Sequence, residues 1–405
     1  MSFYRFSLVA LFVLGGAVPS VLADSARAMR TELHGREAYT LENDAMRISM
    51  LTGGGFIGEV RFRSKDAKKA VNPLRVPHYQ TFDPQNFDPA RHQSYYGTRL
   101  GAGYMGSFLC FPYIGKNTVP AEIAAEVTTH GEAVGVKWEI EPMVTKDGSA
   151  KIVASTELPV TRYRVRRTLT LRPGETVVRV DEEVENLTGV ARPYQWGQHL
   201  TFGPPFLASG RTFADAPVSK ILYADQPEED SFNSAVDWPN AIDPTGRSFD
   251  ASIYGITPGG RASRVWFMDP DRQHTWATLF NADHRVLIGH VFPKTENPWI
   301  LDWQENRSAT NPPWEGQGVA RALLVGTGAF GLGLAGSIEQ GEVFDTPIVA
   351  EIGAHETLRQ SYLIFLAEIE SGFQGVDELK VTEDSITLIE RTTGNQIKVN
   401  GGGKL

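Results

Sequence analysis

The sequence has very little cysteine and lacks long hydrophobic runs beyond its N-terminus. Its 405 residues include a single cysteine, Cys110, so the chain cannot form an internal disulfide bond. After the first two dozen residues, no apolar run approaches the ~20 residues that a membrane-spanning helix needs. The sequence therefore predicts a protein without a membrane span, whose fold does not depend on disulfide bonds.

Cations are also in short supply. The chain has 39 Lys and Arg residues against 48 Asp and Glu residues, a formal net charge of -9, which argues against nucleic acid as a main partner. One basic stretch, TRYRVRR at 161–167, places Arg162, Arg164 and Arg166 on one face of a strand. Either this face is a solvated outer surface or it binds an anionic ligand.

Helical periodicity is the third absence, because no amphipathic segment of four turns occurs and strands do not alternate with helices. The 40 glycines and 24 prolines suit short strands joined by tight turns. Segments such as ETVVRVDEEVEN alternate with the period of two that is typical of strands. Turns are predicted at 51–56, 171–176 and 392–396, and a last hairpin within 370–405. The prediction is an all-β protein with helix below roughly a tenth of the chain, in one antiparallel domain over 24–405.

The N-terminus has the pattern of a secretory signal peptide at residues 1–23. Arg5 precedes the short apolar stretch SLVALFVLGGAV, and small residues before Asp24 suit cleavage after Ala23. Export of a chain with one cysteine favours a periplasmic location, or secretion, over a disulfide-rich secreted scaffold.

The stretch YQWGQHLTFGPPFL at 194–207 puts a histidine inside a strand. Alternation divides it into a core face and a polar face, with Gln195, Gly197, His199 and Thr201 on the polar one. A second histidine, His130, precedes a glycine and another alternating strand. Two histidines beside aromatic-rich loops suggest a sugar site, since aromatic rings stack on sugar C–H surfaces and His, Gln and Asn bond hydroxyls.

Five segments in this order resemble the aldose 1-epimerases, which have the galactose mutarotase-like β-supersandwich fold. They are an opening hairpin that leads to NPL (39–74), GSFLCFPYIG (106–115), AEIAAEVTTHGEAVGVKW (121–138), WGQHLTFGPPFL (196–207) and a Trp-rich pair of strands (300–331). The resemblance covers most of the chain after residue 23.

The resemblance implies a fold and a set of roles. The fold would be an antiparallel β-supersandwich. His130 would contact the sugar near its ring oxygen, and His199 would be the general acid that protonates that oxygen. No metal or organic cofactor is expected, and the partner would be a monosaccharide or an oligosaccharide.

Two positions depart from the family. Its general base is a glutamate in a strand that matches RALLVG at 321–326, and Leu324 stands in its place. An Arg-Gly-Gly segment of some relatives is replaced by Tyr104, Met105 and Gly106. Another base would have to come from Glu315, Glu305 or Asp302. The residues expected to contact substrate besides the two histidines are Tyr104, Gln195, Trp303, Asp302, Glu315 and Leu324.

Two functions therefore remain open from the sequence. The favoured one is an exported sugar enzyme that uses acid/base chemistry, and the alternative is a carbohydrate-binding protein that has lost the catalytic base. A metal site is a third hypothesis for the loop 78–92, which gathers His78, Asp83, Asp88 and His92, although turn chemistry explains these residues more simply. The sequence does not define the sugar or the oligomeric state.

Overall fold

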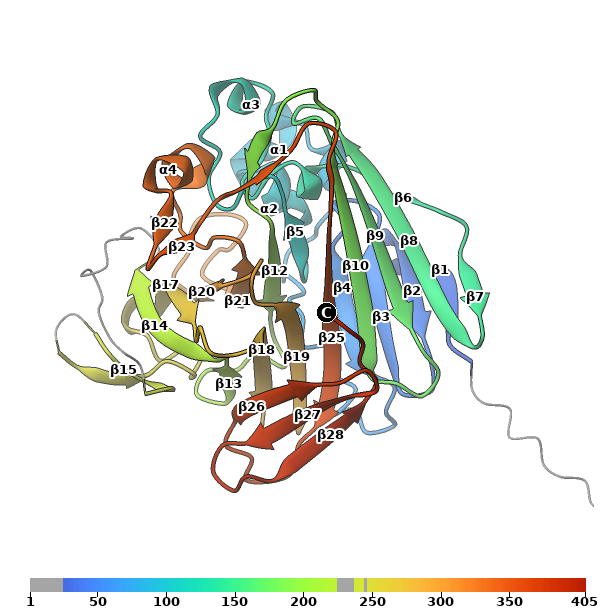
Figure 1. Ribbon diagram of the computed structural model, residues 1–405, viewed down its shortest axis with the longest axis vertical. Coiled ribbons are helices and arrows are strands. Elements are labelled where there is room, and N and C mark those ends of the chain that lie inside the picture. Colours follow the sequence, from blue (N-terminus) through green and yellow to red (C-terminus); the bar gives the residue numbers. More distant parts are fainter. Residues whose placement is uncertain (1–24, 224–236, 244–245) are drawn as a thin grey trace, which may run out of the picture.

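The computed structural model describes residues 25–223, 237–243 and 246–405 (Figure 1). It is 47% strand and 9% helix, which confirms the prediction of an all-β fold with little helix. The predicted signal peptide at residues 1–23 lies outside the described residues. Among the described residues, no helix is long and apolar enough to cross a lipid bilayer.

Two large antiparallel sheets form the body of the protein. The six-stranded sheet has the order β14 (Val218–Tyr223), β17 (Arg261–Met268), β20 (Trp299–Asn306), β21 (Val319–Gly326), β12 (Gly197–Phe202) and β5 (Phe108–Cys110). The nine-stranded sheet has the order β13 (Thr212–Asp215), β18 (His274–Asn281), β19 (Val286–Pro293), β25 (Thr357–Glu368), β10 (Val177–Asn186), β9 (Tyr163–Leu171), β8 (Ser149–Leu158) and β6 (Glu139–Ile140), and β7 (Val144–Lys146) also pairs with β8.

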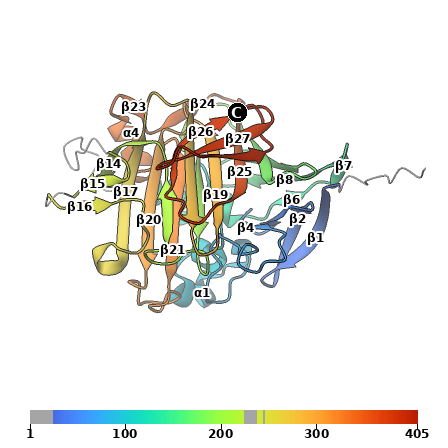
Figure 2. The same cartoon turned by 90° about the horizontal axis from the view of Figure 1, so that it is seen from below.

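Smaller sheets extend this body, as Figures 1 and 2 show. The N-terminal four-stranded sheet contains β1 (Arg27–Leu33), β2 (Arg36–Glu42), β3 (Met46–Leu51) and β4 (Ile57–Phe62). The C-terminal three-stranded sheet contains β26 (Val376–Val381), β27 (Ser385–Glu390) and β28 (Gln396–Asn400), so this region forms three strands rather than the one hairpin predicted. Two-stranded ribbons pair β11 (Arg192–Tyr194) with β24 (Ala350–Ile352), β15 (Asn240–Ile242) with β16 (Ser248–Asp250), and β22 (Glu342–Val343) with β23 (Thr346–Pro347).

Short helices occupy the connections. They are α1 (Pro89–Tyr96), α2 (Arg99–Gly103), α3 (Pro120–Ala124) and α4 (Gly333–Gln340), with 3-10 turns η1 (Pro84–Asn86), η2 (Ala133–Gly135) and η3 (Pro258–Gly260). In α1, Asp88 caps the N-terminus by accepting a hydrogen bond from the Ala90 N–H, and Gly97 ends the helix with a φ of 72°. The region 64–120, which lacked a clear pattern in the sequence, thus holds α1, α2 and β5.

Strand alternation creates the core. In β9, each second residue from Tyr163 to Leu171 is buried, and β10 alternates in the same way, as the period-two pattern predicts. The buried faces of both large sheets contribute to the principal hydrophobic cluster. A second cluster lies between the nine-stranded sheet and the C-terminal sheet. The predicted turns at 51–56, 171–176 and 392–396 each join two consecutive strands.

Arg164 and Arg166 form the expected exposed face of β9, whereas Arg162 precedes the strand with a φ of 59°. Arg164 pairs with Glu157 and Glu185, and Arg166 pairs with Glu141. These pairs support the interpretation of a solvated outer surface, because each guanidinium already has a carboxylate partner.

A buried ion pair within the nine-stranded sheet also contacts the six-stranded sheet. Arg167 of β9 donates to Glu182 of β10 at 2.7 Å, and both side chains are almost fully buried. The other carboxylate oxygen of Glu182 accepts hydrogen bonds from Trp196 Nε1 at 3.0 Å and from Gln198 Nε2 at 2.6 Å. Glu182 therefore connects the nine-stranded sheet to β12.

We predict that Glu182→Gln lowers the free energy of unfolding by about 3 kcal/mol or more, because it leaves a buried arginine without a counter-ion. Glu185→Gln is the matched control on the same strand, since Glu185 pairs with Arg164 in an exposed ion pair that is worth at most about 1 kcal/mol. Urea unfolding of both variants measures the difference. Equal losses for the two variants would contradict the prediction.

Candidate functional site

His199 lies on β12, which is next to the edge strand β5 in the six-stranded sheet. Its register partners are Phe108 of β5 and Leu324 of β21. Gln198 points inward to Glu182, so alternation places His199 on the opposite face of the sheet, as the sequence predicts. His199 is only 5% exposed.

His130 reaches the same place from the loop that precedes η2. It has a φ of 66°, and its N–H donates to the Gly115 carbonyl at 2.7 Å. The next residue must be glycine, because a Cβ at Gly131 would stand 2.1 Å from the carbonyl oxygen of Phe111. The His-Gly pair in the sequence is thus explained by the close approach of this loop to the Phe111 backbone.

The two imidazoles are in contact. Their ring centroids are 4.9 Å apart at an interplanar angle of 76°. Phe108 stacks on His199 at 4.4 Å, and the Tyr104 ring stands edge-on at 5.9 Å. We call His130, His199, Phe108 and Tyr104, with Leu324, the two-histidine cluster. The sequence predicts two imidazoles that face one cleft within a sugar ring's span of each other, about 6–9 Å apart. The observed contact leaves no room for a sugar ring between the two imidazoles.

Hydrogen bonds restrict the proton positions on the two rings. The Gly115 N–H donates to Nδ1 of His130 at 3.2 Å, so Nδ1 is an acceptor and the neutral ring carries its proton on Nε2. Nδ1 of His199 lies 2.8 Å from Thr201 Oγ1, which is itself 3.2 Å from the Tyr104 hydroxyl. Hydroxyls both donate and accept, so this series of hydrogen bonds is compatible with either tautomer of His199. Among the described residues, none bonds Nε2 of either imidazole.

Burial controls the electrostatics of the two-histidine cluster. Desolvation lowers the pKa of His130 to about 4. It also lowers the pKa of His199 well below its usual value, and the neighbouring His130 and Arg75 lower it further. Desolvation raises the pKa of Cys110, whose Sγ is 3.4 Å from His130 Nδ1. At neutral pH the two-histidine cluster therefore holds two neutral imidazoles, and the neighbouring Cys110 is a thiol, not a thiolate.

Leu324 is fully buried and packs in the hydrophobic cluster that includes Phe108 and Tyr104. It stands directly across from His199 in the sheet register. The position that matched a catalytic glutamate by sequence is thus next to His199 in space, and its side chain is apolar. It cannot accept a proton.

Trp303 of β20 shares the sheet face of the cluster, because its register partner is Ala322 and that of Ala322 is Thr201. Asp302 points to the opposite face, where it forms a fully buried ion pair with Arg321 at 2.8 Å. Gln195 precedes β12 instead of continuing its polar face, and it is buried with hydrogen bonds to Ile114, Ser337 and Ile348. Asp302 and Gln195 are therefore not brought to the cluster.

Glu305 and Glu315 lie on the segment that follows β20. Glu305 is buried and accepts hydrogen bonds from the N–H groups of Ser308 and Ala309, so it holds the turn that leads to Trp314. Glu315 is exposed, with a φ of 49°. Desolvation raises the pKa of Tyr95 in α1, and the Glu315 carboxylate adds to this effect. Of the two, Glu315 has the freer carboxylate.

The four residues of loop 78–92 have separate partners or surroundings. Asp83 pairs with Arg36 at 2.8 Å, Asp88 caps α1, and the His92 ring lies 4.7 Å from that of Phe82. His78 is exposed beside Tyr79. Within the described ranges, no group of three or more His, Cys, Asp or Glu side chains is arranged to hold a metal ion.

Sequence reasoning missed two residues at the cluster, Arg75 and Trp314. The Arg75 guanidinium lies 4.3 Å from the Tyr104 ring centroid and 4.6 Å from that of Trp314. The ring centroids of Trp314 and Trp303 are 6.1 Å apart. The available signals were an arginine among apolar residues in NPLRVP and a tryptophan after two prolines in NPPWEG.

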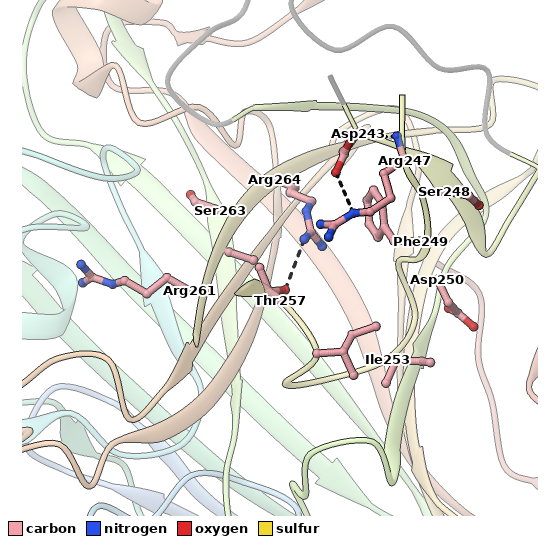
Figure 3. A pocket seen from close by; sticks show the side chains of 12 residues that line it. Asp243, Arg247, Ser248, Phe249, Asp250, Ile253, Thr257, Arg261, Ser263 and Arg264 are labelled. Carbon is pink, nitrogen blue, oxygen red and sulfur yellow. Dashed lines mark hydrogen bonds and ion pairs between the residues drawn. The ribbon is translucent and has the colours of Figure 1, made fainter. Parts of the chain in front are cut away.

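Several hollows among the described residues lie outside the two-histidine cluster. One has a volume of about 450 Å³, and its wall includes Thr129, the residue before His130. Another, of about 530 Å³, is shown in Figure 3 between β17 and the 243–257 segment. There Arg247 bonds Asp243 and Arg264 bonds Thr257, and neither histidine is in its wall.

Known proteins support the fold that carries this site. A family model described as a domain of unknown function (DUF4432) matches residues 102–311, just over half of the chain. A candidate aldose 1-epimerase from Klebsiella pneumoniae is 15% identical, with a TM-score of 0.60 over 84% of this chain and 83% of the other. A comparison with curated proteins found no match.

Two further solved structures agree. A galactose mutarotase-like protein from Clostridium acetobutylicum is 14% identical, with a TM-score of 0.56 over 85% of this chain and 99% of that one. A candidate mutarotase from Salmonella typhimurium is 11% identical, with a TM-score of 0.54 over 84% and 94%. Identities this low show a shared fold, and they confirm the galactose mutarotase-like architecture predicted from the sequence.

The lowered pKa of His130 predicts a pH dependence of stability. An unfolded histidine binds its proton near pH 6.5 but folded His130 only near pH 4, so the unfolded chain holds more protons in this window. Stability therefore falls as the pH falls from about 6.5 to about 4, by up to about 1.4 kcal/mol per pH unit from this residue. His130→Asn, which tolerates the positive φ, should make the slope shallower.

The matched control is His78→Asn, which changes an exposed histidine outside the cluster. Denaturant unfolding at pH 4.5, 5.5, 6.5 and 7.5 gives the slope for each protein. A His130→Asn slope equal to that of the parent would show that His130 is not held neutral by burial.

Proposed function

The chain belongs to the family defined by a domain of unknown function (DUF4432), and we propose that it binds a saccharide at the two-histidine cluster and slowly epimerises its anomeric carbon. The observation that carries this proposal is the contact of two neutral imidazoles, with both Nε2 atoms unbonded, in an aromatic wall. Aromatic rings suit the C–H faces of a sugar, and imidazole suits its hydroxyls. The mutarotase-like fold supports the assignment but does not establish the chemistry.

The arrangement favours a proton shuttle on one side of the sugar. When the proton of His199 is on Nδ1 and donated to Thr201, Nε2 accepts the proton of the anomeric hydroxyl O1–H. The C1–O5 bond breaks as the C1–O1 carbonyl forms, and the imidazolium returns the proton to O5. Rotation about C1–C2 and reversal of these steps give the other anomer. The Nε2–H of His130 donates a hydrogen bond to the sugar throughout.

This chemistry is weaker than that of a site with a carboxylate. The lowered pKa of His199 makes it a poor proton acceptor, and Leu324 leaves no carboxylate beside it. General acid–base groups contribute ~10²–10⁴-fold to rate, so the loss of one group removes a large factor. The same two observations favour the second candidate function, a carbohydrate-binding protein without catalysis. In either case, residues 1–23 lead us to propose export to the periplasm or secretion.

We predict that the wild-type protein binds sugar but catalyses mutarotation of galactose or glucose at most weakly. Leu324→Glu should raise the rate by ~10²-fold, because it places a carboxylate directly across from His199. Polarimetry measures the rate, and a calorimetric titration measures binding. Leu324→Gln is the control: glutamine has the same size as glutamate but no charge, so this variant should have the same rate as the wild-type protein.

The folded state of Leu324→Glu must be checked by thermal unfolding, because a buried carboxylate is costly. His199→Asn should abolish whatever rate the wild-type protein has. Binding without any rotation change in the wild type would select the binding-only function. Wild-type turnover as fast as that of a carboxylate-based mutarotase would refute the proposal and direct attention to Glu315.

A further inference from the structure

Arg75 differs from the other buried arginines. Four arginines among the described residues are buried: Arg36, Arg75, Arg167 and Arg321. Three of them pair with a carboxylate, Arg36 with Asp83, Arg167 with Glu182 and Arg321 with Asp302. Arg75 is 2% exposed and forms no ion pair with any described residue. A buried charge without a counter-ion is unfavourable, so its retention calls for an explanation.

Aromatic rings hold the Arg75 guanidinium in place. It lies over the rings of Tyr104 at 4.3 Å, Trp314 at 4.6 Å and Tyr79 at 5.6 Å. Its hydrogen bonds go to neutral oxygens only, the Tyr104 carbonyl and the Tyr79 hydroxyl. Cation–π contacts offset part of the cost of burial, but they leave the positive charge in the site.

The charge lies beside the imidazoles. The backbone N–H of Arg75 donates to the Thr201 carbonyl at 2.9 Å, and Thr201 Oγ1 bonds both His199 and Tyr104. Arg75 is also one of the groups that lower the pKa of His199, after desolvation and His130. Nε of Arg75 makes no hydrogen bond to a described residue, so the guanidinium keeps donors for a ligand.

We propose that Arg75 recognises a carboxylate on the bound sugar, so that the ligand class is a monoanionic sugar, a uronic acid, and not a neutral hexose. The inference rests on the proposed function, because it assumes that a saccharide occupies the two-histidine cluster. A guanidinium presents donors in a fork that matches a carboxylate, and such charge-assisted pairs are strong when water is excluded. The ligand supplies the counter-ion that the fold does not.

Charge balance favours a carboxylate over a phosphate ester. Arg75 brings one positive charge, and the neighbouring imidazoles are neutral at pH 7. A uronate carries one negative charge, whereas a phosphate monoester carries about -1.5 to -2. A phosphate at this position would leave an uncompensated charge in a buried site.

Titration calorimetry on the full chain tests the inference with two matched sets of sugars. One set is galacturonate, galactose and galactose 6-phosphate, and the other is the corresponding gluco compounds. In at least one set, the wild-type protein should bind the uronate about tenfold or more tighter than the hexose. Arg75→Gln should remove this preference while hexose affinity changes less than about threefold. Arg75→Lys should retain part of it, because lysine keeps the charge and loses the fork.

Arg261→Gln is the matched control, since it removes an arginine that is exposed on β17 of the same sheet. Equal wild-type affinity for uronate and hexose would overturn the inference, and so would an equal loss of affinity for both sugars in Arg75→Gln. Either result would show that Arg75 only supports the aromatic rings, while the proposal of saccharide binding would stand. Tighter binding of the 6-phosphate would overturn the choice of a monoanion. If neither set binds at all, the proposed function itself is wrong. If Arg75→Gln does not fold, the inference is still tested by the preference of the wild-type protein for uronate over hexose and by the change in that preference in Arg75→Lys.

Discussion

The buried carboxylate of Glu182 is the constraint on which the site depends. It holds Arg167 on one side and Trp196 and Gln198 on the other, so it fixes β12 against the nine-stranded sheet. Because side chains alternate along a strand, fixing Gln198 inward also fixes His199 outward. The orientation of the candidate acid/base group is thus set by a polar network on the far side of the sheet. A shift of one residue in β12 would break both at once.

Sequence reasoning predicted what depends on local pattern. Period two predicted the strands, turn residues predicted the hairpins, and alternation placed His199 on the polar face of its strand, away from the core. It also brought His130 and His199 to one site, through a family resemblance that the fold now supports. It failed where the outcome depends on partners that are distant in sequence. Asp302 and Leu324 lie on neighbouring strands but on opposite faces of the sheet. This is shown only by their partners in the fold, because Asp302 pairs with Arg321 and Leu324 stands across from His199.

The same limit explains the residues that were missed. The residues around Arg75 in the sequence do not indicate that its guanidinium lies against Tyr104 and Trp314, which are some 30 and 240 positions away along the chain. Gln195 was placed on the polar face because alternation was extended two residues too far. The strand begins at Gly197, and Gln195 instead satisfies backbone groups of the loops around it. A difference of two residues in where the strand begins thus determines whether Gln195 lies at the site.

Residue 324 sets the charge of the two-histidine cluster. A carboxylate there would face His199 across β12 and β21, and an adjacent negative charge raises the pKa of an imidazole. With leucine, no carboxylate at this position counteracts desolvation, which lowers the pKa of both imidazoles. Arg75 then contributes a positive charge that no described carboxylate balances. For the proposed function, leucine in place of a carboxylate would thus have two linked consequences: it would weaken proton transfer at His199, and it would leave the positive charge of Arg75 unbalanced, which would favour an anionic ligand over a neutral one.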